Sequence, residues 1–352
     1  MTKAHLLLLS AYRADSHGAW ADRLVRAHPE FEWSRLELPG RHFRWRIRGN
    51  PLSWLDRMPE RPPDMIVATS MVDLATLRGL HPVLTATPAV YYFHENQFAY
   101  PVSDRQVDSV DPQMVQLYGA LAAERVAFNS AFNRDSFLEG VDALLARMPD
   151  HVPSGVARRL REKSRICPVP IDPIAPAARR DERLIVWNHR WEYDKNPDLF
   201  AHTMLDLAGR GIDFRLALLG PRPRTGGTAA LQRLRSALGE RIVADGQLEA
   251  TQYHAVLARA GLVVSTARHE FQGLAMLEAA SAGARPLVPD TLCYPEQYPP
   301  ACHYPAGDVE ALATRLQHWL TCGLPPPVDV SAWHPDTLNE AWRRLLAPSA
   351  GA

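Results

Sequence analysis

The sequence contains few cysteines, no excess of charge of either sign and no long apolar run. Only four of its 352 residues are cysteine and none are spaced as C-x-x-C, which argues against a disulfide framework or a zinc knuckle and favours reduced thiols. Because 39 basic residues balance 39 acidic ones, a generally basic nucleic-acid binder is excluded, and any such contact needs a local patch. Apolar stretches such as 4–9 and 83–93 fall short of the ~20 residues that cross a bilayer.

The composition that remains is typical of a large globular protein. Hydrophobic residues make up 46% of the chain and charged residues 22%, close to the average for soluble domains. A chain of this length usually divides into two domains, because single cores stop growing near ~250–300 residues. The apolar run at 6–9 is followed at once by Tyr12, Arg13 and Asp15, which is not the pattern of a secretory leader. We therefore expect a cytoplasmic protein.

Short apolar runs alternate with longer amphipathic ones along the first half of the chain. Strands are predicted at 4–10, 31–38, 65–69, 89–93 and 125–129, and helices at 19–27, 72–79, 112–123 and 133–147. Since these strands are mostly apolar on both faces, they predict a parallel sheet that is covered on both sides.

A proline-rich and then charged stretch interrupts this alternation. Pro168, Pro170, Pro173 and Pro176 are followed by the run RRDER at 179–183, which is typical of a linker. A second alternation follows. Its strands are predicted at 184–188, 214–219, 241–244, 262–266 and 285–288, and its helices at 198–208, 229–238, 251–260, 273–282 and 309–320. A last amphipathic segment is predicted at 335–346.

The predicted fold is therefore α/β, with two doubly wound, Rossmann-like domains that face a cleft. The predicted boundaries are 1–172 for the first domain, 173–330 for the second, and 331–352 for a C-terminal helix that packs back toward the first.

The most informative stretch is RHEFQGLAMLEAA at 268–280. A predicted strand precedes it and a predicted helix begins near Leu274, so Glu270 is expected in the loop at the carboxyl end of a strand and Glu278 within the helix. Backbone N–H groups near Gly273 and Leu274 would form a helix N-terminus that suits a phosphate. The two carboxylates could accept hydrogen bonds from a transferred sugar and from a ribose. The alternative is a surface glutamate on an ordinary amphipathic helix.

The loop WNHRWEYDKNP at 187–197 follows the first strand of the second half. Its Arg190 and Lys195 could neutralise a pyrophosphate and stabilise that group as it leaves. In the alternative interpretation the charges of this loop pair internally, Arg190 with Glu192 or Asp194.

No metal site is predicted. The strings HENQF at 94–98 and HEFQG at 269–273 begin like the zinc motif H-E-x-x-H, but neither has the second histidine. The sequence also contains no D-x-D triad, so nothing indicates a carboxylate-held divalent metal at a diphosphate. We expect Arg190, Lys195 and a helix N-terminus to take the place of a metal, and no cofactor.

Arg190 and Lys195, followed by Glu270 and Glu278 in an E-x7-E arrangement, resemble the retaining GT-B glycosyltransferases of family 4. Longer strings are similar to one branch, the tRNA-queuosine mannosyltransferase family. These strings are YFHENQ at 92–97, YPV at 100–102, FNSAFN at 128–133, PDH at 149–151, HRWE at 189–192 and HEF at 269–271. The resemblance runs in matching order from near residue 5 to about residue 300.

This resemblance implies a GT-B fold and transfer of mannose from GDP-mannose, with retention, to a hydroxyl of the cyclopentene diol of queuosine in a tRNA anticodon. It implies that the first domain binds the acceptor and the second binds the donor. In the second domain, Arg190 and Lys195 would hold the diphosphate near Gly273 and Leu274. Glu270 would bind the donor sugar. The ribose would meet Glu278, and the base would meet Gly246, Gln247 and Leu248.

In the first domain, the resemblance implies that His94 reaches the donor sugar or the reacting centre from the end of the fourth strand. It places Ser16 and His17 near the phosphates. The family tends to have two glycines before this Ser-His pair, whereas this chain has Ala14 and Asp15, which changes how closely the first loop approaches the phosphates.

Two arginine-rich stretches are candidates for contact with tRNA. RHFRWRIR at 41–48 sets arginines among aromatic residues without an acid, and RRLREKSR at 158–165 adds further basic residues. Arginines beside exposed aromatic rings suit single-stranded loops, where bases stack and phosphates are paired. The alternative is a solvated basic face. The residues predicted to contact the acceptor are Arg41, Arg44, Trp45, Arg46, Arg48, Asn96, Arg158, Arg159 and Arg161.

Three other functions stay open on the sequence. A family 4 enzyme with a lipid, polysaccharide or small-molecule acceptor would want an exposed apolar or basic amphipathic helix; none stands out, and no membrane partner is expected. A catalytically silent nucleotide-sugar or RNA-binding protein is disfavoured by the intact Arg190, Lys195, Glu270 and Glu278. A sugar-nucleotide epimerase would need no macromolecular acceptor. No pattern in the sequence indicates an oligomeric state.

Overall fold

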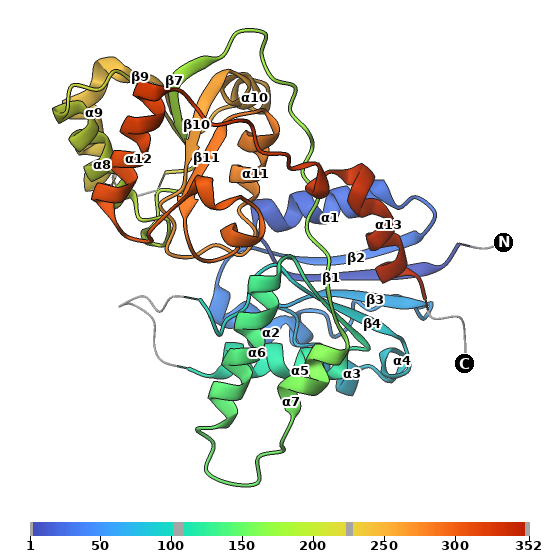
Figure 1. Cartoon of the computed structure of the whole chain (residues 1–352). Helices are drawn as coiled ribbons and strands as arrows, with labels where there is room; N and C mark the ends of the chain where they lie inside the picture. Colours follow the sequence, from blue (N-terminus) through green and yellow to red (C-terminus); the bar gives the residue numbers. More distant parts are fainter. Residues whose placement is uncertain (1–2, 101–108, 223–227, 349–352) are drawn as a thin grey trace. The chain divides into compact units, whose positions relative to one another are not determined.

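The computed structural model describes residues 3–100, 109–222 and 228–348 (Figure 1). The chain forms two units. The N-terminal unit comprises Met1–Val169 together with Leu338–Ala352, and the C-terminal unit comprises Pro170–Thr337. Pro101 and Val102, from one of the family-like strings, lie outside the described residues.

The N-terminal unit is built on a parallel six-stranded sheet with the order β2-β1-β3-β4-β5-β6. Its central strands are apolar at almost every position, and every residue of β3 and β4 is buried. The strands are β1 (His5–Arg13), β2 (Glu32–Pro39), β3 (Met65–Thr69), β4 (Ala89–Phe93), β5 (Arg125–Phe128) and β6 (Ser164–Ile166).

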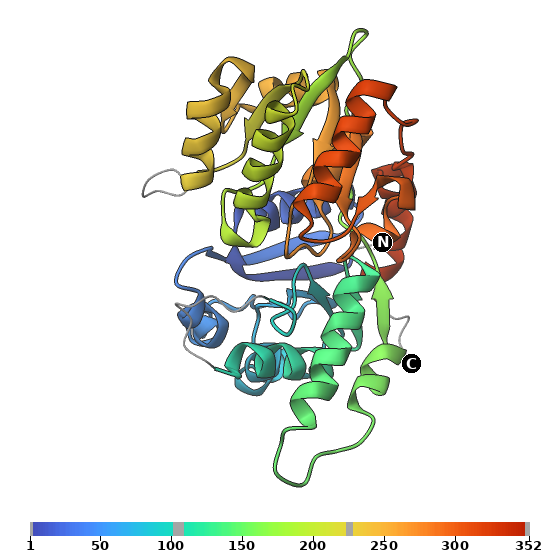
Figure 2. The ribbon, with the colours of Figure 1, turned by 60° about the vertical axis from the view of Figure 1, so that its left-hand side comes forward.

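Helices cover both faces of this sheet (Figures 1 and 2). Because side chains alternate along β4, Phe93 faces one layer and Tyr92 the other. Phe137 packs on Phe93 with 4.6 Å between ring centroids, whereas Trp20 stacks on Tyr92 at 5.1 Å. The layer of Phe137 contains α2 (Phe43–Ser53), α3 (Leu74–Leu80), α4 (Pro82–Thr85), α5 (Asp111–Ala122), α6 (Ala131–Leu145) and α7 (Val156–Glu162), and that of Trp20 contains α1 (Asp15–Ala27) and α13 (Pro335–Leu346).

Helix α13 belongs mostly to the N-terminal unit although it is the last helix of the chain. Its Trp342 is 1% exposed, and the indole lies 4.9 Å from the ring of Tyr92. The Nε1 of Trp342 donates to the carbonyl of Pro168 at 2.9 Å, and Arg125 donates to the carbonyl of Leu345 at 2.6 Å. Helix α13 therefore covers the part of the N-terminal sheet that α1 does not cover.

The C-terminal unit has a second parallel six-stranded sheet, with the order β12-β11-β10-β7-β8-β9. Its strands are β7 (Asp181–Trp187), β8 (Arg215–Leu219), β9 (Ile242–Gly246), β10 (Ala260–Val264), β11 (Arg285–Pro289) and β12 (His303–Tyr304).

Helices also cover both faces of the second sheet (Figures 1 and 2). One face carries α8 (Pro197–Gly209), α9 (Ala229–Leu238) and α12 (Val309–Cys322), and the other carries α10 (Ala250–Arg259) and α11 (Leu274–Ser281). Short 3-10 turns complete the unit at η1 (Tyr193–Lys195), η2 (Gly239–Arg241), η3 (Tyr294–Glu296), η4 (Pro300–Cys302) and η5 (Ser331–Trp333).

Each sheet has a point where the strand order reverses. From β1 the chain moves to β2 on one side and then to β3 on the other; from β7 it moves to β8 and β9, and then returns to β10 on the opposite side. In open α/β sheets, ligands bind at the carboxyl ends of the strands beside such a reversal. The segments that follow β1 and β3, and those that follow β7 and β10, are therefore the places to look for a site.

The predicted fold class is confirmed as two doubly wound α/β units, but several short elements were not predicted. The largest is α2. In its sequence Phe43, Trp45 and Ile47 alternate with arginines, a period of two that favours a strand. The buried Asn50 instead bonds to the carbonyls of Ile47 and Met71 and fixes a helix against the neighbouring loop. The strands β6 and β12 were missed because they have only three and two residues.

No helix in the described parts of the chain is both long enough and apolar enough to cross a membrane.

Candidate active site

The strongest polar constellation of the C-terminal unit lies where its strand order reverses. Lys195 ends η1, shortly after β7, and Glu270 lies in the loop after β10. The Nζ of Lys195 is 3.0 Å from Oε2 of Glu270 and 3.4 Å from Oδ2 of Asp194, and it donates to the carbonyl of His269 at 2.8 Å. Lys195 is only 7% exposed and the side chain of Glu270 is 20% exposed, so the ammonium and the carboxylate are largely shielded from bulk water.

Backbone hydrogen bonds join the two loops that carry this pair. The N–H groups of Arg268 and His269 both donate to the carbonyl of Asp194, at 2.8 and 3.2 Å. The hydroxyl of Thr266 donates to the carbonyl of Lys195 at 2.8 Å. The chain leaves η1 through Asn196, which has a φ of 50°, and Pro197 then begins α8. Lys195 and Glu270 are consequently positioned by main-chain contacts and not by side-chain pairing alone.

Both members of the pair are charged at neutral pH. Burial raises the pKa of Glu270, but the Lys195 ammonium, His189 and the N–H of Gly273 together lower it by more, to about 2. Burial lowers the pKa of Lys195, while the carboxylates of Glu270 and Asp194 raise it to a net increase. Burial, followed by the nearby Lys195 charge, lowers the pKa of His189 and of His269 to about 4. The site therefore holds fixed charges beside neutral imidazoles.

Gly273 and Leu274 form the start of α11 beside Glu270. The carboxylate of Glu270 accepts the N–H of Phe271 at 3.1 Å, and a hydrogen bond from the N–H of Gly273 also lowers its pKa. Gly273 has a φ of 64°, and a Cβ there would lie 3.1 Å from the ring of Tyr294. Glycine therefore allows the backbone to turn into α11. The positive end of the α11 helix dipole then lies next to the Lys195–Glu270 pair.

Glu278, the second carboxylate of the E-x7-E arrangement, lies within α11. Its Oε2 accepts a hydrogen bond from the hydroxyl of Tyr253 at 2.9 Å, and that hydroxyl accepts one from Asn188 at 3.1 Å. Neither Tyr253 nor Asn188 was singled out from the sequence. Asn188 lies two residues before Arg190 in a motif that was recognised, but Tyr253 is on a predicted helix with no local motif to indicate it.

Arg190 shows the internal pairing that the sequence left open. Its guanidinium lies 2.8 Å from the carboxylate of Glu192 and 3.4 Å from that of Asp194. Half of the side chain is exposed, at 48%. Its role toward a diphosphate stays a prediction. Gly246, with a φ of 123°, ends the edge strand β9, and the exposed Gln247 and the partly buried Leu248 follow it.

The N-terminal unit places two predicted residues in direct contact. His17, in the first turn of α1, stacks on His94, which follows β4, with 4.5 Å between ring centroids. The rings of His94 and Trp20 are nearly perpendicular, also with 4.5 Å between their centroids. Burial, and then the proximity of His17, lowers the pKa of His94 well below its ordinary value. Its Nε2 is buried and has no hydrogen-bond partner among the described residues. Ser16 lies exposed at the start of α1.

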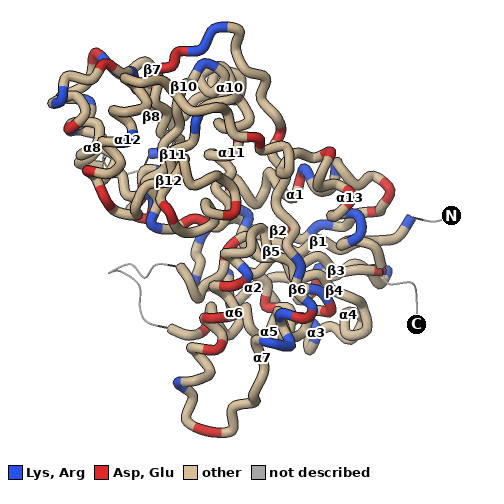
Figure 3. Tube along the Cα trace, in the orientation of Figure 1, with Lys and Arg blue, Asp and Glu red and all other residues tan. Residues whose placement is uncertain are grey.

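Most residues of the two arginine-rich stretches lie on separate helices of the N-terminal unit, α2 and α7 (Figure 3). On α2 the indole of Trp45 is 52% exposed and lies over Gly49, where a Cβ would approach it to 2.6 Å. Arg48 pairs with Asp73 at 2.7 Å, and on α7 Arg161 pairs with Asp135 at 2.8 Å. The other arginines predicted to contact the acceptor are exposed, except for the partly buried Arg46; they are Arg41, Arg44, Arg158 and Arg159.

Asn96 differs from the expectation that it contacts the acceptor. Its side chain is 0% exposed. The amide nitrogen donates to Asn133 and Ser136, and the amide oxygen accepts the N–H groups of Phe98 and Ala99. In the described structure Asn96 shapes the loop after β4 from within and offers no atom to a ligand.

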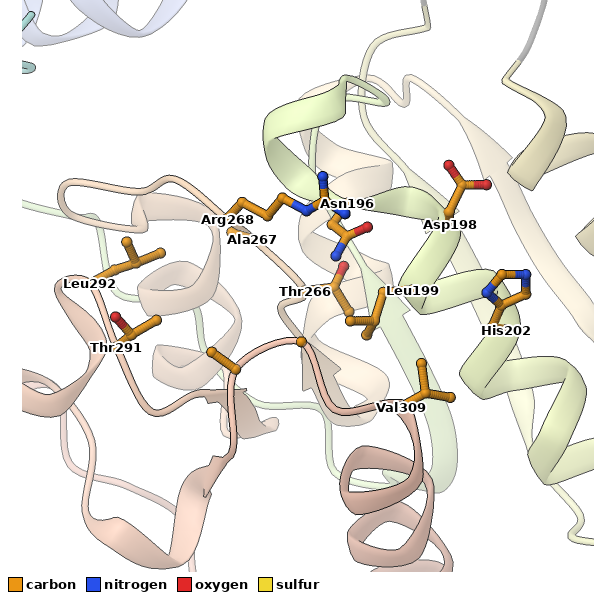
Figure 4. A pocket seen from close by; sticks show the side chains of 12 residues that line it. Asn196, Asp198, Leu199, His202, Thr266, Ala267, Arg268, Thr291, Leu292 and Val309 are labelled. Atoms are coloured by element: carbon orange, nitrogen blue, oxygen red, sulfur yellow. The ribbon is translucent and has the colours of Figure 1, made fainter. Parts of the chain in front are cut away.

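A pocket of about 540 Å³ adjoins the Lys195–Glu270 pair within the C-terminal unit (Figure 4). It lies at the carboxyl ends of β10, β11 and β12, against α8 and the start of α12. Figure 4 shows Arg268 and Asn196 close together on one side and His202 on the other. The pocket is lined by Asn196, Asp198, Leu199, His202, Thr266, Ala267, Arg268, Thr291, Leu292, Ala306, Gly307 and Val309. None of the predicted donor residues lines it.

Among residues 3–100, 109–222 and 228–348, no group of three or more His, Cys, Asp or Glu side chains could hold a metal ion. The expectation of a metal-free diphosphate site stays a prediction.

Comparison with known proteins gives the class of this molecule. Residues 182–322, which carry Lys195, Glu270 and Glu278, match the family model "Glycosyl transferases group 1". The structure is similar to sucrose-phosphate synthase from Thermosynechococcus elongatus (TM-score 0.69, 15% identity, 98% of this chain and 94% of that one). It is also similar to the lipopolysaccharide outer core galactosyltransferase WaaB (TM-score 0.65, 11% identity, 97% and 98%). The protein is a glycosyltransferase with the GT-B fold.

The particular family follows from the whole chain. Residues 5–171 match the model of the tRNA-queuosine alpha-mannosyltransferase N-terminal region. The tRNA-queuosine alpha-mannosyltransferase of Drosophila melanogaster is 33% identical over 339 residues, which cover 92% of this chain and 88% of the relative. The chain belongs to the tRNA-queuosine alpha-mannosyltransferase family, which confirms the resemblance drawn from the sequence.

Proposed function

We propose that the protein transfers mannose from GDP-mannose to queuosine in a tRNA anticodon, with retention of the anomeric configuration. The observation that carries this proposal is the 33% identity to a tRNA-queuosine alpha-mannosyltransferase along nearly the whole chain. The intact Lys195–Glu270 pair and the E-x7-E carboxylates support a catalytically active member over a silent binding protein.

Charge in the C-terminal unit suits a sugar nucleotide diphosphate. The Lys195 ammonium and the N-terminus of α11 would stabilise the negative charge that grows on the departing GDP. Arg190 would exchange its partners Glu192 and Asp194 for a phosphate. These groups would replace a divalent cation, so we propose that donor binding needs no metal. Glu270, an anion at neutral pH with a pKa of about 2, would accept hydrogen bonds from hydroxyls of the donor sugar.

Side chains of the N-terminal unit would serve the acceptor and the reacting sugar. The buried Nε2 of His94 can bond a sugar hydroxyl, because the low pKa of this imidazole keeps it neutral and His94 follows a strand end beside His17. The exposed arginines of α2 and α7, with Trp45, would bind the phosphates and bases of the anticodon loop. No protein base is assigned, and we propose that the leaving phosphate takes the proton of the acceptor hydroxyl.

The test is incubation with GDP-[14C]mannose and tRNA that contains queuosine, followed by isolation of the RNA. We expect label in the RNA, and none with tRNA that carries unmodified guanosine at the same position. Label from UDP-glucose or UDP-galactose in place of GDP-mannose would contradict the donor. Consumption of GDP-mannose without labelled RNA would contradict the acceptor. A parallel reaction with EDTA should proceed at the same rate, and loss of activity on chelation would contradict the metal-free site.

A further inference from the structure

Three elements of the C-terminal unit meet at the hydroxyl of Tyr253. Asn188 follows β7, Tyr253 lies on α10, and Glu278 lies on α11. The hydroxyl of Tyr253 is 2.9 Å from Oε2 of Glu278 and 3.1 Å from Nδ2 of Asn188. These residues are close neighbours only in the folded chain, because Tyr253 and Glu278 are separated by 25 positions.

The hydrogens of this network can be assigned from its geometry. The amide nitrogen of Asn188 lies 2.8 Å from the carbonyl of Ala275, and a carbonyl can only accept, so the nitrogen and not the oxygen of the amide must face it. The second hydrogen of that nitrogen then points to the phenol oxygen of Tyr253. The phenol must donate its own proton to Glu278. Burial, and then the nearby Glu278 charge, raises the pKa of Tyr253 well above its ordinary value, so this proton is present at neutral pH.

We propose that Tyr253 is a positioning residue that holds the Glu278 carboxylate for the vicinal hydroxyls of the nucleotide's ribose. The inference rests on the proposed function, together with the ribose-binding role that the family resemblance implies for Glu278. A hydrogen bond from a neutral phenol to a carboxylate is charge-assisted and directional. It fixes one oxygen of Glu278. Asn188, which donates to the same phenol, also donates to the carbonyl of Ala275 in the first turn of the helix that carries Glu278. The carboxylate is therefore oriented before a nucleotide arrives, which lowers the cost of binding.

The competing explanation is that the network only fastens α10 to α11. In that case the loss of the Tyr253 hydroxyl would lower the stability of the protein and would weaken the binding of all nucleotides to the same degree. Positioning of a ribose-binding carboxylate has a different effect, because only ligands that carry the ribose hydroxyls should then bind more weakly.

The experiment measures the affinities of GDP and of 2′,3′-dideoxy-GDP by titration calorimetry for the wild type and for Tyr253→Phe. We expect Tyr253→Phe to bind GDP about tenfold more weakly, as is typical for the loss of one hydrogen bond to a charged group. We expect its affinity for dideoxy-GDP to be within twofold of the wild-type value. In a Glu278→Ala background, Tyr253→Phe should change GDP affinity less than twofold.

Tyr304→Phe is the matched control, because it removes another buried tyrosine hydrogen bond of the same unit, from the Tyr304 hydroxyl to the carbonyl of Ser265. It should lower the melting temperature without changing the ratio of GDP to dideoxy-GDP affinity. Equal weakening of both nucleotides by Tyr253→Phe would overturn the inference and leave the proposed function intact. A wild-type protein that binds UDP but not GDP would overturn the proposed donor alone, and the same comparison with dideoxy-UDP would then test Tyr253. Failure to bind any nucleoside diphosphate would overturn both.

Discussion

The two units have closely similar sheets but different chemistry where their strand order reverses. At the reversal in the N-terminal unit, two imidazole rings stack, and His94 is kept neutral by burial and by His17. At the reversal in the C-terminal unit, Lys195 and Glu270 form a largely buried ion pair that stays charged across the physiological range. The comparison teaches that doubly wound topology fixes where a site forms, whereas the side chains on the loops decide whether that site offers charge or neutral polar contacts.

The largest effect is expected from a substitution that destabilises the N-terminal unit alone. Trp342→Ala removes a fully buried indole that contacts Trp20 and Tyr92, and should lower the free energy of unfolding of this unit by about 3–5 kcal/mol. Chemical denaturation measures this loss, and Tyr118→Ala, on the exposed side of α5, is the control with a change below about 0.5 kcal/mol. GDP affinity measured below the unfolding transition should not change. A parallel loss of GDP affinity would show that the two units are not energetically separate.

The charged pair of the C-terminal unit should dominate catalysis. Lys195→Ala and Glu270→Gln should each lower kcat about 10²–10³-fold, because each removes charge that is held in place before the reaction. Steady-state mannose transfer provides the measurement, and Glu240→Gln, an exposed carboxylate in η2, should leave the rate unchanged. If both site variants keep more than a tenth of wild-type turnover, the roles of Lys195 and Glu270 are wrong.

The buried imidazoles of the C-terminal unit should make its stability dependent on pH. His189 and His269 have a pKa of about 4 in the folded state, below the ordinary value of 6.5. The unfolded chain therefore binds protons first as the pH falls. The contribution of these two histidines to the free energy of unfolding is fully present above about pH 6.5. It decreases by up to about 1.4 kcal/mol per pH unit for each histidine as the pH falls, and it does not change further below about pH 4.

Denaturation at pH 7.5, 6, 5 and 4 tests this dependence. His189→Asn should have a shallower slope between pH 6.5 and 4 than the wild type. Replacement of the exposed His254 by Asn should leave the slope unchanged. If the free energy of unfolding depends on pH in the same way in all three proteins, the buried histidines are not the cause of the dependence.

The smallest effect is expected for the arginines of α2. If each neutralises one phosphate of a single-stranded loop, its loss should flatten the dependence of log K on log[salt] by about 0.7. Because Arg48 already pairs with Asp73, Arg48→Ala should flatten the slope less than Arg46→Ala. The measurement is tRNA binding across a salt series, and GDP affinity should stay constant. An unchanged slope in the Arg44, Arg46 and Arg48 triple alanine variant would mean that α2 carries only a solvated face.

Much of the fold could be predicted because its central strands are apolar on both faces and helices such as α1 and α13 have a clear apolar face. The strand of Ala89–Phe93 was predicted to the residue, since every one of its positions is buried. The helix α2 could not be predicted, because its local pattern favours a strand and tertiary bonds of Asn50 decide the outcome.

In the candidate site, too, features set by local sequence could be predicted and features set by tertiary contacts could not. Glu270 and Glu278 were found because a strand, a loop and a helix follow one another within a short stretch of sequence. The family resemblance indicated His94, but its stacking on His17 and Trp20 depends on how β1 and β4 lie in the sheet. Tyr253 could not be found, since only the packing of α10 against α11 brings it to Glu278. Asn96 was assigned to a ligand because sequence does not distinguish an amide that is enclosed from one that is exposed.

The return of α13 to the N-terminal unit has a consequence for synthesis on the ribosome. Trp20 and Tyr92 are translated early, but their partner Trp342 emerges only after the whole C-terminal unit has been made. At roughly 5–20 residues per second, that delay is on the order of ten seconds or more. Once β12 has been made, the second unit has all of its own strands, whereas the face of the first sheet that Trp342 covers still lacks α13. The unit that begins first is therefore completed last, because the helix that finishes it is the last helix of the chain to be made.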